Sequence, residues 1–207
     1  MKLKRGIISV YVLLACFSYS TASAQGAATA PQSSGKWEFS VSVGHEELDS
    51  ETAYQAYIED NAWSIGISAD YDSGRWLSSI GLGIVRYRDD AGFTQGTVDG
   101  WGDYDNSEST ASGTLLSFAI GPRWKVGADE SVLLYTQAGL GKMFESSRSI
   151  ANCSNCYEED IDLESGLFAR FGLIKELGSF GLGFSLTQYL SGDGQDRSLS
   201  FIWSTAY

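Results

Sequence analysis

The sequence predicts an all-β fold, an eight-stranded antiparallel up-and-down barrel that crosses a membrane with its strands. Three observations lead to this prediction. Apolar and polar residues alternate with a period of two in eight separate runs. The connections between these runs are alternately long and short, and six aromatic residues fall at the same end of their runs. A barrel whose apolar side chains face lipid is expected to show all three features.

The first 24 residues are typical of a secretory signal peptide. An apolar run over residues 7–17 is followed by the small residues Ala22-Ser23-Ala24, which suit cleavage before Gln25. The run is shorter than the roughly 20 residues that a transmembrane helix needs. The basic start of the segment consists of Lys2, Lys4 and Arg5. We therefore expect residues 1–24 to direct export and to be removed.

A flexible leader is expected over residues 25–35, which are small and polar and contain Pro31. One alternative concerns Cys16, since the preceding Leu13-Leu14-Ala15 resembles a lipoprotein processing box. Leu14 is not the small residue usual at its position, and lipidation of Cys16 stays open at this point.

The first four runs begin at residue 36. In the first, Trp37, Phe39, Val41 and Val43 share one parity, and a strand places them on one face, with the polar residues between them on the other. The next three apolar sets extend over residues 63–71, 76–84 and 116–124. Pro122 weakens the fourth run locally, because proline cannot donate a ladder hydrogen bond.

The last four runs repeat the pattern over residues 134–141, 167–174, 180–190 and 199–207. The closing run is expected to pair with the first run and to close the barrel. The long connections are residues 45–62, 88–112 and 143–165, whereas the short ones are 72–75, 127–130 and 178–179 and one of intermediate length covers 191–196. Short turns at one end and long loops at the other are typical of outer-membrane barrels.

Aromatic side chains and small residues indicate which face is outside. The residues expected to form an aromatic girdle at the lower membrane interface are Trp37, Tyr71, Trp76, Trp124, Phe180 and Tyr207. The opposite faces consist mostly of Ser and Gly, which suit the narrow interior of an eight-stranded barrel. The alternative is a soluble barrel of the lipocalin type, in which the apolar faces would point into a ligand cavity.

Four segments carry a resemblance to a known family. They are Gly81-Leu82-Gly83, Gly121-Pro122-Arg123-Trp124, Ala138-Gly139-Leu140-Gly141 and Phe201 to Tyr207. Together they resemble the small eight-stranded outer-membrane β-barrels, the group of OmpA-like transmembrane domains, OmpX and opacity proteins. The resemblance implies an outer-membrane barrel domain over residues 36–207, located in the bacterial outer membrane. It further implies contact with outer-membrane lipid and lipopolysaccharide, insertion by the barrel-assembly machinery, and a monomer.

Charged residues with interior parity form the first candidate site. Charges in a narrow interior are costly unless they are paired and hydrogen-bonded. We therefore expect Arg123 and Arg170 to meet Glu38 or Asp70 across the lumen and to block conduction. Lys125 has the same parity. The alternative is a solvated polar lumen without specific pairs.

Two cysteines, Cys153 and Cys156, lie in the third long connection. Exported proteins favour disulfides, and the sequence predicts a local bridge between these two residues. A redox site would need a βαβ context, and a zinc site would need ligands beyond the only histidine, His45.

The long connections are acidic. Acidic clusters can bind Ca²⁺ or Mg²⁺ weakly through oxygen ligands, and residues 103–107 have the alternate spacing of a calcium loop without its glycine. No cofactor is expected, and a solvated surface that interacts through its charge is the leading interpretation. The net charge of −12 repels phosphate backbones and argues against nucleic-acid binding.

A non-enzymatic role in envelope structure or surface interaction is therefore expected, presented by acidic loops on a rigid scaffold. Two other function classes remain as alternatives. One is a narrow conduit for small apolar molecules, resembling OmpW, which would need a lateral opening or an apolar lumen. The other is a lipid A-modifying enzyme, for which His45 would have to serve as the base. The partner of the loops is not evident from the sequence.

Overall fold

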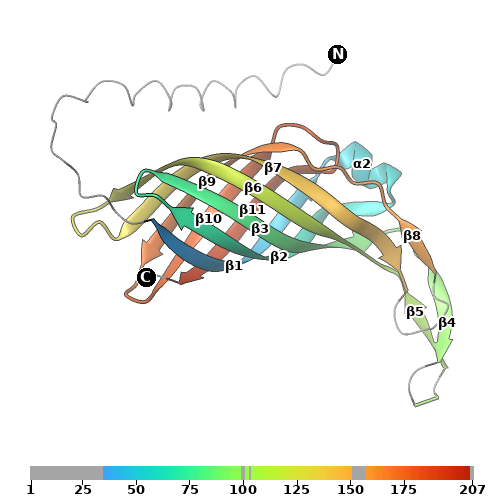
Figure 1. The fold of residues 1–207 in the computed structure, drawn as a ribbon. Coiled ribbons are helices and arrows are strands. Elements are labelled where there is room, and N and C mark those ends of the chain that lie inside the picture. The colour runs from blue at the N-terminus through green and yellow to red at the C-terminus, as the bar shows by residue number, and fades with distance from the viewer. Residues whose placement is uncertain (1–34, 99–100, 103, 151–156, 206–207) are drawn as a thin grey trace. The chain divides into compact units, whose positions relative to one another are not determined.

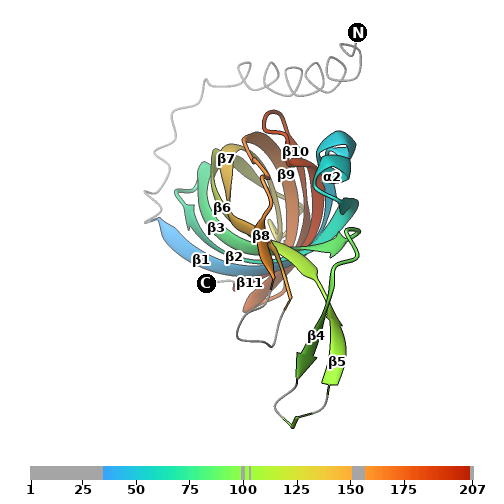
Figure 2. The same ribbon diagram turned by 90° about the vertical axis from the view of Figure 1, so that its right-hand side faces the viewer.

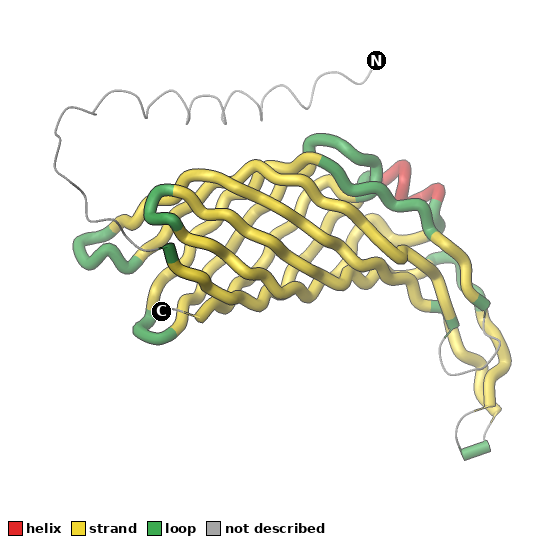
Figure 3. Tube along the Cα trace, viewed as in Figure 1, coloured by secondary structure: helices red, strands yellow, loops and turns green. Residues whose placement is uncertain are grey.

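The computed structural model describes residues 35–98, 101–102, 104–150 and 157–205, all of which belong to one unit of the chain. They form a closed antiparallel barrel of eight strands, shown as a ribbon in Figure 1 and as a backbone tube in Figure 3. The barrel strands are β1 (Lys36–Leu48), β2 (Ile58–Asp72), β3 (Trp76–Asp89), β6 (Thr110–Val126), β7 (Val132–Ser149), β9 (Leu167–Glu176), β10 (Phe180–Tyr189) and β11 (Gln195–Thr205). The predicted fold class is confirmed.

Closure of the barrel depends on two pairings. The order of the strands is β6-β3-β2-β1-β11-β10-β9-β7, and an additional pairing joins β6 to β7. At the seam between the first and last strands, Val41 is the partner of Trp203 and Val43 is the partner of Phe201. The predicted pairing of the closing run with the first run is therefore confirmed. Because the sheet is closed, these eight strands leave no long unpaired edge.

Apolar side chains cover the outside of the barrel wall, as the alternation predicted. Phe39 on β1, Ile67 on β2 and Phe118 on β6 are each more than half exposed. The small residues between them point inward. Serine hydroxyls meet across the strands there, and Ser40 and Ser68 lie 2.6 Å apart. A wall that is apolar outside and polar inside is the reverse of a soluble barrel.

This arrangement inverts toward one end of the barrel, here called the loop end because α2, β4, β5 and β8 lie there (Figure 1). A core of buried apolar side chains fills the interior at this end. Its members are Leu48, Ala53, Ile58, Ala62, Val85, Tyr87, Ala111, Met143, Ile161 and Leu163. On the outside at the same level, Arg88 pairs with Glu59 at 3.3 Å and Arg197 with Glu47 at 2.5 Å. The barrel therefore has two zones. Its wall is apolar outside and polar inside over most of its height, which we call the lipid-type wall, and it is polar outside and apolar inside at the loop end, which we call the water-type wall.

The long connections contain more regular structure than the sequence predicted. β1, β2, β3, β6 and β7 extend into them, since a strand above the apolar band can still be paired and can bury its inner face. The remaining elements are α2 (Ser50–Gln55), β4 (Thr94–Val98), β5 (Tyr104–Glu108) and β8 (Glu158–Asp160). Asp49 caps α2 by accepting hydrogen bonds from the backbone amides of Glu51 and Thr52, both at 3.1 Å. None of the described residues forms a helix long and apolar enough to cross a bilayer.

The strands β4 and β5 pair only with each other among the described residues, as a two-stranded sheet at the loop end (Figure 2). Phe93 precedes this hairpin and lies against Tyr157, with 4.8 Å between the ring centroids. The backbone amide of Tyr157 donates to Gln95 Oε1 at 3.1 Å. The second and third long connections are therefore held together through the base of the hairpin.

Candidate functional site

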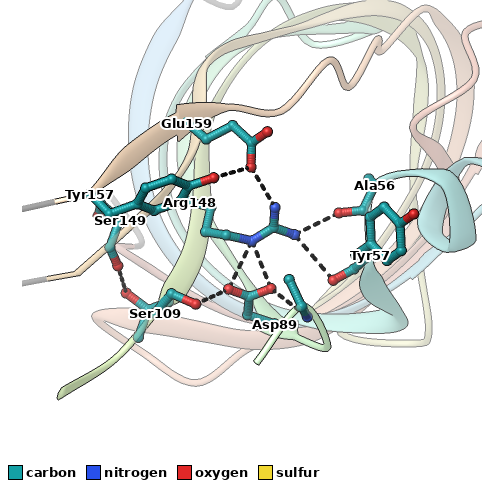
Figure 4. A network of polar contacts seen from close by, with 10 residues as sticks. Ala56, Tyr57, Asp89, Ser109, Arg148, Ser149, Tyr157 and Glu159 are labelled. Atoms are coloured by element: carbon teal, nitrogen blue, oxygen red, sulfur yellow. Dashed lines mark hydrogen bonds and ion pairs between the residues drawn. The ribbon is translucent and has the colours of Figure 1, made fainter. Parts of the chain in front are cut away.

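A buried guanidinium stands at the centre of the loop end (Figure 4). It belongs to Arg148 on β7, whose side chain is only 4% exposed. Its Nε lies 2.8 Å from both carboxylate oxygens of Asp89, the last residue of β3. Charge-assisted hydrogen bonds of this kind are about twice as strong as neutral ones. Asp89 is buried to a similar degree, with a side chain that is 2% exposed.

The two other nitrogens of Arg148 reach the remaining connections. Nη1 donates to Glu159 on β8 at 2.9 Å. Nη2 donates to the backbone carbonyls of Ala56 and Tyr57, which follow α2, at 2.6 and 3.1 Å. One side chain therefore joins all three long connections of the barrel. We call Arg148, Asp89 and Glu159, with these two carbonyls, the loop clamp.

Further contacts complete the hydrogen bonding of the clamp carboxylates. Ser109 donates its hydroxyl to Asp89, and the backbone amide of Ala91 donates to the same carboxylate at 3.1 Å. The hydroxyl of Tyr157 donates to Glu159 at 2.8 Å. The Phe93 ring covers the guanidinium, with its centroid 5.5 Å from the central carbon of Arg148. Both buried charges consequently have partners, as buried charges need.

Hydrogen bonding shifts the titration of the exposed part of the clamp. The hydrogen bond from Tyr157, followed by that from Arg148, holds the pKa of Glu159 below its ordinary value. The same hydrogen bond to Glu159 raises the pKa of the Tyr157 hydroxyl. At neutral pH the clamp therefore contains an ionised Glu159 and a neutral tyrosine.

Arg148 was not among the predicted site residues, because the parity of its run places it on the outside. Met143 faces inward as expected, but Arg148, which has the opposite parity, is buried as well. Between them Glu145 has a positive φ of 50°, and the register between β6 and β7 shifts by one residue at this level. This β-bulge exchanges the two faces of the strand and turns Arg148 inward. The acidic residues of the long connections were predicted to form a solvated surface. Asp89 is instead buried, and Glu159 is only about half exposed because it pairs with Arg148.

An acidic cleft of about 670 Å³ opens beside the clamp. Arg148, Phe93 and the α2 residues Thr52 and Gln55 line one part of it, and carboxylates line the rest. These carboxylates belong to Glu159, Asp160, Asp162, Glu164 and Asp193. The clamp fixes the segments that carry them, so the charge is presented on a rigid frame.

The interior of the barrel wall holds a cavity of about 110 Å³. Glu38, Asp70 and Arg170 line it together with many serines. Gln137 also reaches into it and is almost fully buried, donating to Ser79 Oγ at 2.7 Å. The volume suits a few water molecules.

The interior ion pairs differ from those that the sequence led us to expect. Arg123 forms its ion pair with Asp72, and both side chains are 9% exposed. This partner is favoured because Arg123 lies beside the short turn that follows Asp72, and its Nε donates to the carbonyl of Gly74 in that turn at 3.4 Å. Glu38 and Asp70, the predicted partners, are not paired with it.

The two other predicted cations also lie differently. Arg170 donates to Thr187 on the neighbouring strand at 3.2 Å and stacks on the Phe168 ring at 5.0 Å. Lys125 is near the end of β6, where it pairs with Glu176 at 2.9 Å and is about one third exposed, outside the lumen cavity. Side chains near the end of a strand reach solvent even when they have interior parity. Parity alone therefore could not distinguish Lys125 from a residue inside the lumen.

The five described residues of the predicted aromatic girdle lie at the turn end of the barrel, opposite the loop end. Trp37, Trp76 and Trp124 are about half exposed and Tyr71 slightly less. Trp37 and Tyr71 are register partners, and their ring centroids lie 5.2 Å apart. Phe180 begins β10 at the same end and is partly buried.

Several predictions fall outside the described residues. They are the signal peptide 1–24 with Cys16, the leader over residues 25–34, the Cys153–Cys156 bridge and the last member of the girdle, Tyr207. Among the described side chains, no group of three or more His, Cys, Asp or Glu could hold a metal ion. Residues 104–108 form strand β5, whose pairing with β4 replaces the calcium-loop geometry considered for this segment.

Comparison with known proteins gives structural neighbours only. No protein-family model and no curated protein matches the sequence. Ail of Yersinia pestis, solved in complex with the heparin analogue sucrose octasulfate, is 16% identical and has a TM-score of 0.45, with 82% of this chain and 98% of that chain covered. Neisserial surface protein A is 11% identical with a TM-score of 0.48, covering 84% of this chain and 99% of that chain. A structure of Ail in a phospholipid bilayer nanodisc, at 17% identity and a TM-score of 0.41, covers 83% and 100%.

This chain and those neighbours are small β-barrels. At these identities the likeness extends to architecture alone, and the barrel of the present chain rests on its own strand pairing.

Proposed function

We propose that this protein is an integral protein of the bacterial outer membrane, with a non-enzymatic role in surface interaction through its clamped, acidic loop end. The observation that carries the proposal is the inversion of the barrel wall. Side chains such as Phe39 and Ile67 would be exposed to water in a soluble protein, whereas lipid removes that cost. The acidic cleft favours a cationic partner, because complementary charge steers and orients association.

Two features support a role other than catalysis. His45, the only histidine of the chain, lies edge-on against Trp63 on the outer wall, with 5.6 Å between the ring centroids. Its Nδ1 has no hydrogen-bond partner among the described residues, whereas a serine hydrolase orients its histidine through such a bond. The apolar conduit considered from the sequence would need an apolar lumen, but serines and charged groups line the cavity.

Location is tested by fractionating bacterial cells that express the full chain. The protein is expected in the outer membrane, with heat-modifiable migration and loops accessible to protease in whole cells. Deletion of Phe201 to Tyr207 removes much of the β11 partner of β1, and we propose that it abolishes assembly by the barrel-assembly machinery. A soluble periplasmic product from the full chain would contradict the proposal.

The surface role is tested with a cationic probe, a fluorescent oligolysine peptide, added to the refolded protein. We expect salt-sensitive binding that falls about tenfold in the variant Asp160→Asn, Asp162→Asn, Glu164→Gln. The control is Asp129→Asn, a carboxylate in the turn between β6 and β7 at the opposite end. Equal loss in both variants would show unspecific attraction to a negatively charged protein.

A further inference from the structure

Two cations on the outer wall form no ion pair with any carboxylate of the described residues. Arg86 on β3 and Lys142 on β7 are both exposed, and neither forms an ion pair within the described part of the chain. The neighbouring outer cations, Arg88 and Arg197, do pair with carboxylates. The chain has 26 acidic and 14 basic residues, yet no described carboxylate pairs with either of these two side chains. An anion from outside the chain would fit there.

Both cations lie where the apolar band ends toward the loop end. Outward side chains ascend β3 in the order Ile80, Leu82, Ile84 and then Arg86, and on β7 Leu140 is followed by Lys142. Aromatic rings accompany them. Trp63 is the register partner of Arg86, and Lys142 Nζ lies 5.2 Å from the Phe144 ring centroid. Cations and aromatic rings above an apolar band occupy the headgroup level of a bilayer.

The register gives the spacing of the two cations. Strand β6 lies between them, with Ser112 opposite Arg86 and Leu116 opposite Lys142. Four residues along a strand and two strand spacings across it separate their Cα atoms by about 16 Å. A single phosphate would not bind both groups closely at this separation. A larger headgroup with two separate phosphates would.

An apolar groove lies on the outer wall below the level of Arg86. It has a volume of about 480 Å³ and extends from Leu116 on β6 across β3, β2 and β1 to Trp203 on β11. Leu116 is the register partner of both Leu82 and Lys142. Lys142 therefore lies in the same row of paired residues as the end of the groove, and Arg86 lies four residues beyond Leu82 on β3. An acyl chain attached to a headgroup at this level would enter the groove here.

We propose that the outer wall binds an anionic lipid of the outer leaflet that carries two phosphates. Arg86 on β3 and Lys142 on β7 contact the phosphates, and the groove that runs from β6 toward β11 holds an acyl chain. This inference rests on the proposed membrane location. The outer wall would then hold one class of lipid at a defined site, in addition to its general contact with the bilayer.

The test uses the refolded protein in nonionic detergent, titrated with hexa-acylated lipid A, a disaccharide lipid with two phosphates, and followed by native mass spectrometry. We expect the variant Arg86→Gln, Lys142→Gln to retain lipid A about thirtyfold more weakly, since each cation near a lipid surface contributes about a factor of five. The charge-conserving variant Arg86→Lys, Lys142→Arg is expected to retain it. The matched control Arg75→Gln removes an exposed cation in the turn between β2 and β3, at the opposite end, and is expected to bind normally.

The outcomes separate the two proposals. Equal lipid A retention in the parent and the double glutamine variant, or equal loss in Arg75→Gln, overturns the lipid site and leaves the membrane location standing. Equal binding of the dephosphorylated lipid also overturns it. Complete displacement of lipid A by millimolar inorganic phosphate would indicate a free-phosphate site and has the same effect. A parent protein that stays soluble without detergent overturns both proposals. Heat-modifiable migration of each variant shows that it is folded.

Discussion

The guanidinium of Arg148 can be buried in the barrel because carboxylates and backbone carbonyls accept its hydrogen bonds. Removing a guanidinium from a buried pair leaves the other charge uncompensated, which costs far more than losing a surface pair. Asp89 would be left in this state, with Ser109 and the amide of Ala91 as its remaining donors. The clamp is therefore the place where one substitution is expected to release three connections together.

We predict that Arg148→Gln destabilises the closed loop end by about 3–5 kcal/mol. Hydrogen exchange checks this at the backbone amide of Asp90, which donates to the carbonyl of Tyr57 at 2.9 Å across the clamp. The control Arg88→Gln breaks the exposed pair with Glu59 and should cost less than about 1 kcal/mol. Similar exchange rates in the two variants would contradict a structural role for the clamp.

Acid should loosen the β8 side of the clamp. The pKa of Glu159 is lowered in the folded chain, so its contribution is present above the ordinary glutamate pKa of about 4.3 and is lost as the pH falls through the folded value. Proteolysis of the third connection by an acid-tolerant protease should therefore accelerate below about pH 4. In Glu159→Gln this connection should be cleaved readily at all pH values, and a parent profile that is flat down to pH 2 would argue against the assignment.

At the scale of elements, an aromatic ring on one strand packs over a glycine on the neighbouring strand. Gly172 on β9 is the register partner of Tyr135 on β7, whose ring occupies the space that a Cβ at Gly172 would need. Gly139 and Phe168 form a second pair of this kind on the same two strands. Both rings are buried, and neither can move aside without disturbing the interior.

We predict that Gly172→Ala destabilises the barrel by about 1–3 kcal/mol, because the added methyl group overpacks the interior beside Tyr135. Urea-induced unfolding in detergent micelles measures the effect. The control is Gly83→Ala on β3, where the nearest atom to an added Cβ is the carbonyl oxygen of Ile65 at 3.6 Å, an ordinary contact. Equal effects at the two glycines would mean that the ring does not constrain the pairing.

At the scale of the whole molecule, buried apolar side chains lie on both sides of the polar cavity inside the barrel. The polar cavity of about 110 Å³ lies in the wall region, and the apolar core around Val85 and Met143 fills the interior at the loop end. Toward the turn end, Leu77, Leu133 and Ile202 form a further buried cluster. The described side chains inside the barrel thus favour a rigid scaffold over a wide channel.

We predict that the refolded protein produces no large, stable channels in planar-bilayer recordings. Arg170→Ala, which removes the cation that lines the cavity, should at most add small and short-lived events, since the apolar core at the loop end is unchanged. Long-lived openings of porin size in the parent protein would be inconsistent with the filled interior.

Much of this architecture could be predicted from local sequence. The alternation, the lengths of the connections and the outward apolar set followed from period two, which is a property of the strand itself. The seam between β1 and β11 followed from the need of a barrel to close. The extension of five strands beyond the apolar band was not predicted, because Val85 and Tyr87 bury an inner face where the outer face is already polar.

The candidate site could be predicted only in part. The period-two alternation correctly predicted that Glu38, Asp70 and Arg170 face the interior cavity. Their partners depend on the register between neighbouring strands, and the sequence of one strand does not contain that information. Arg123 accordingly pairs with Asp72 at the adjacent turn. The clamp joins residues 59 positions apart, Asp89 and Arg148, and its carbonyl acceptors, Ala56 and Tyr57, come from the first long connection.

Repeats within ten residues were enough to predict the class of fold, the number of barrel strands and the outward face of each strand. The folded barrel was needed to show which charges meet, where the apolar outer surface gives way to a polar one, and that Arg86 and Lys142 lie beside one end of an apolar groove. These features depend on the register between strands, and register is fixed when the barrel closes.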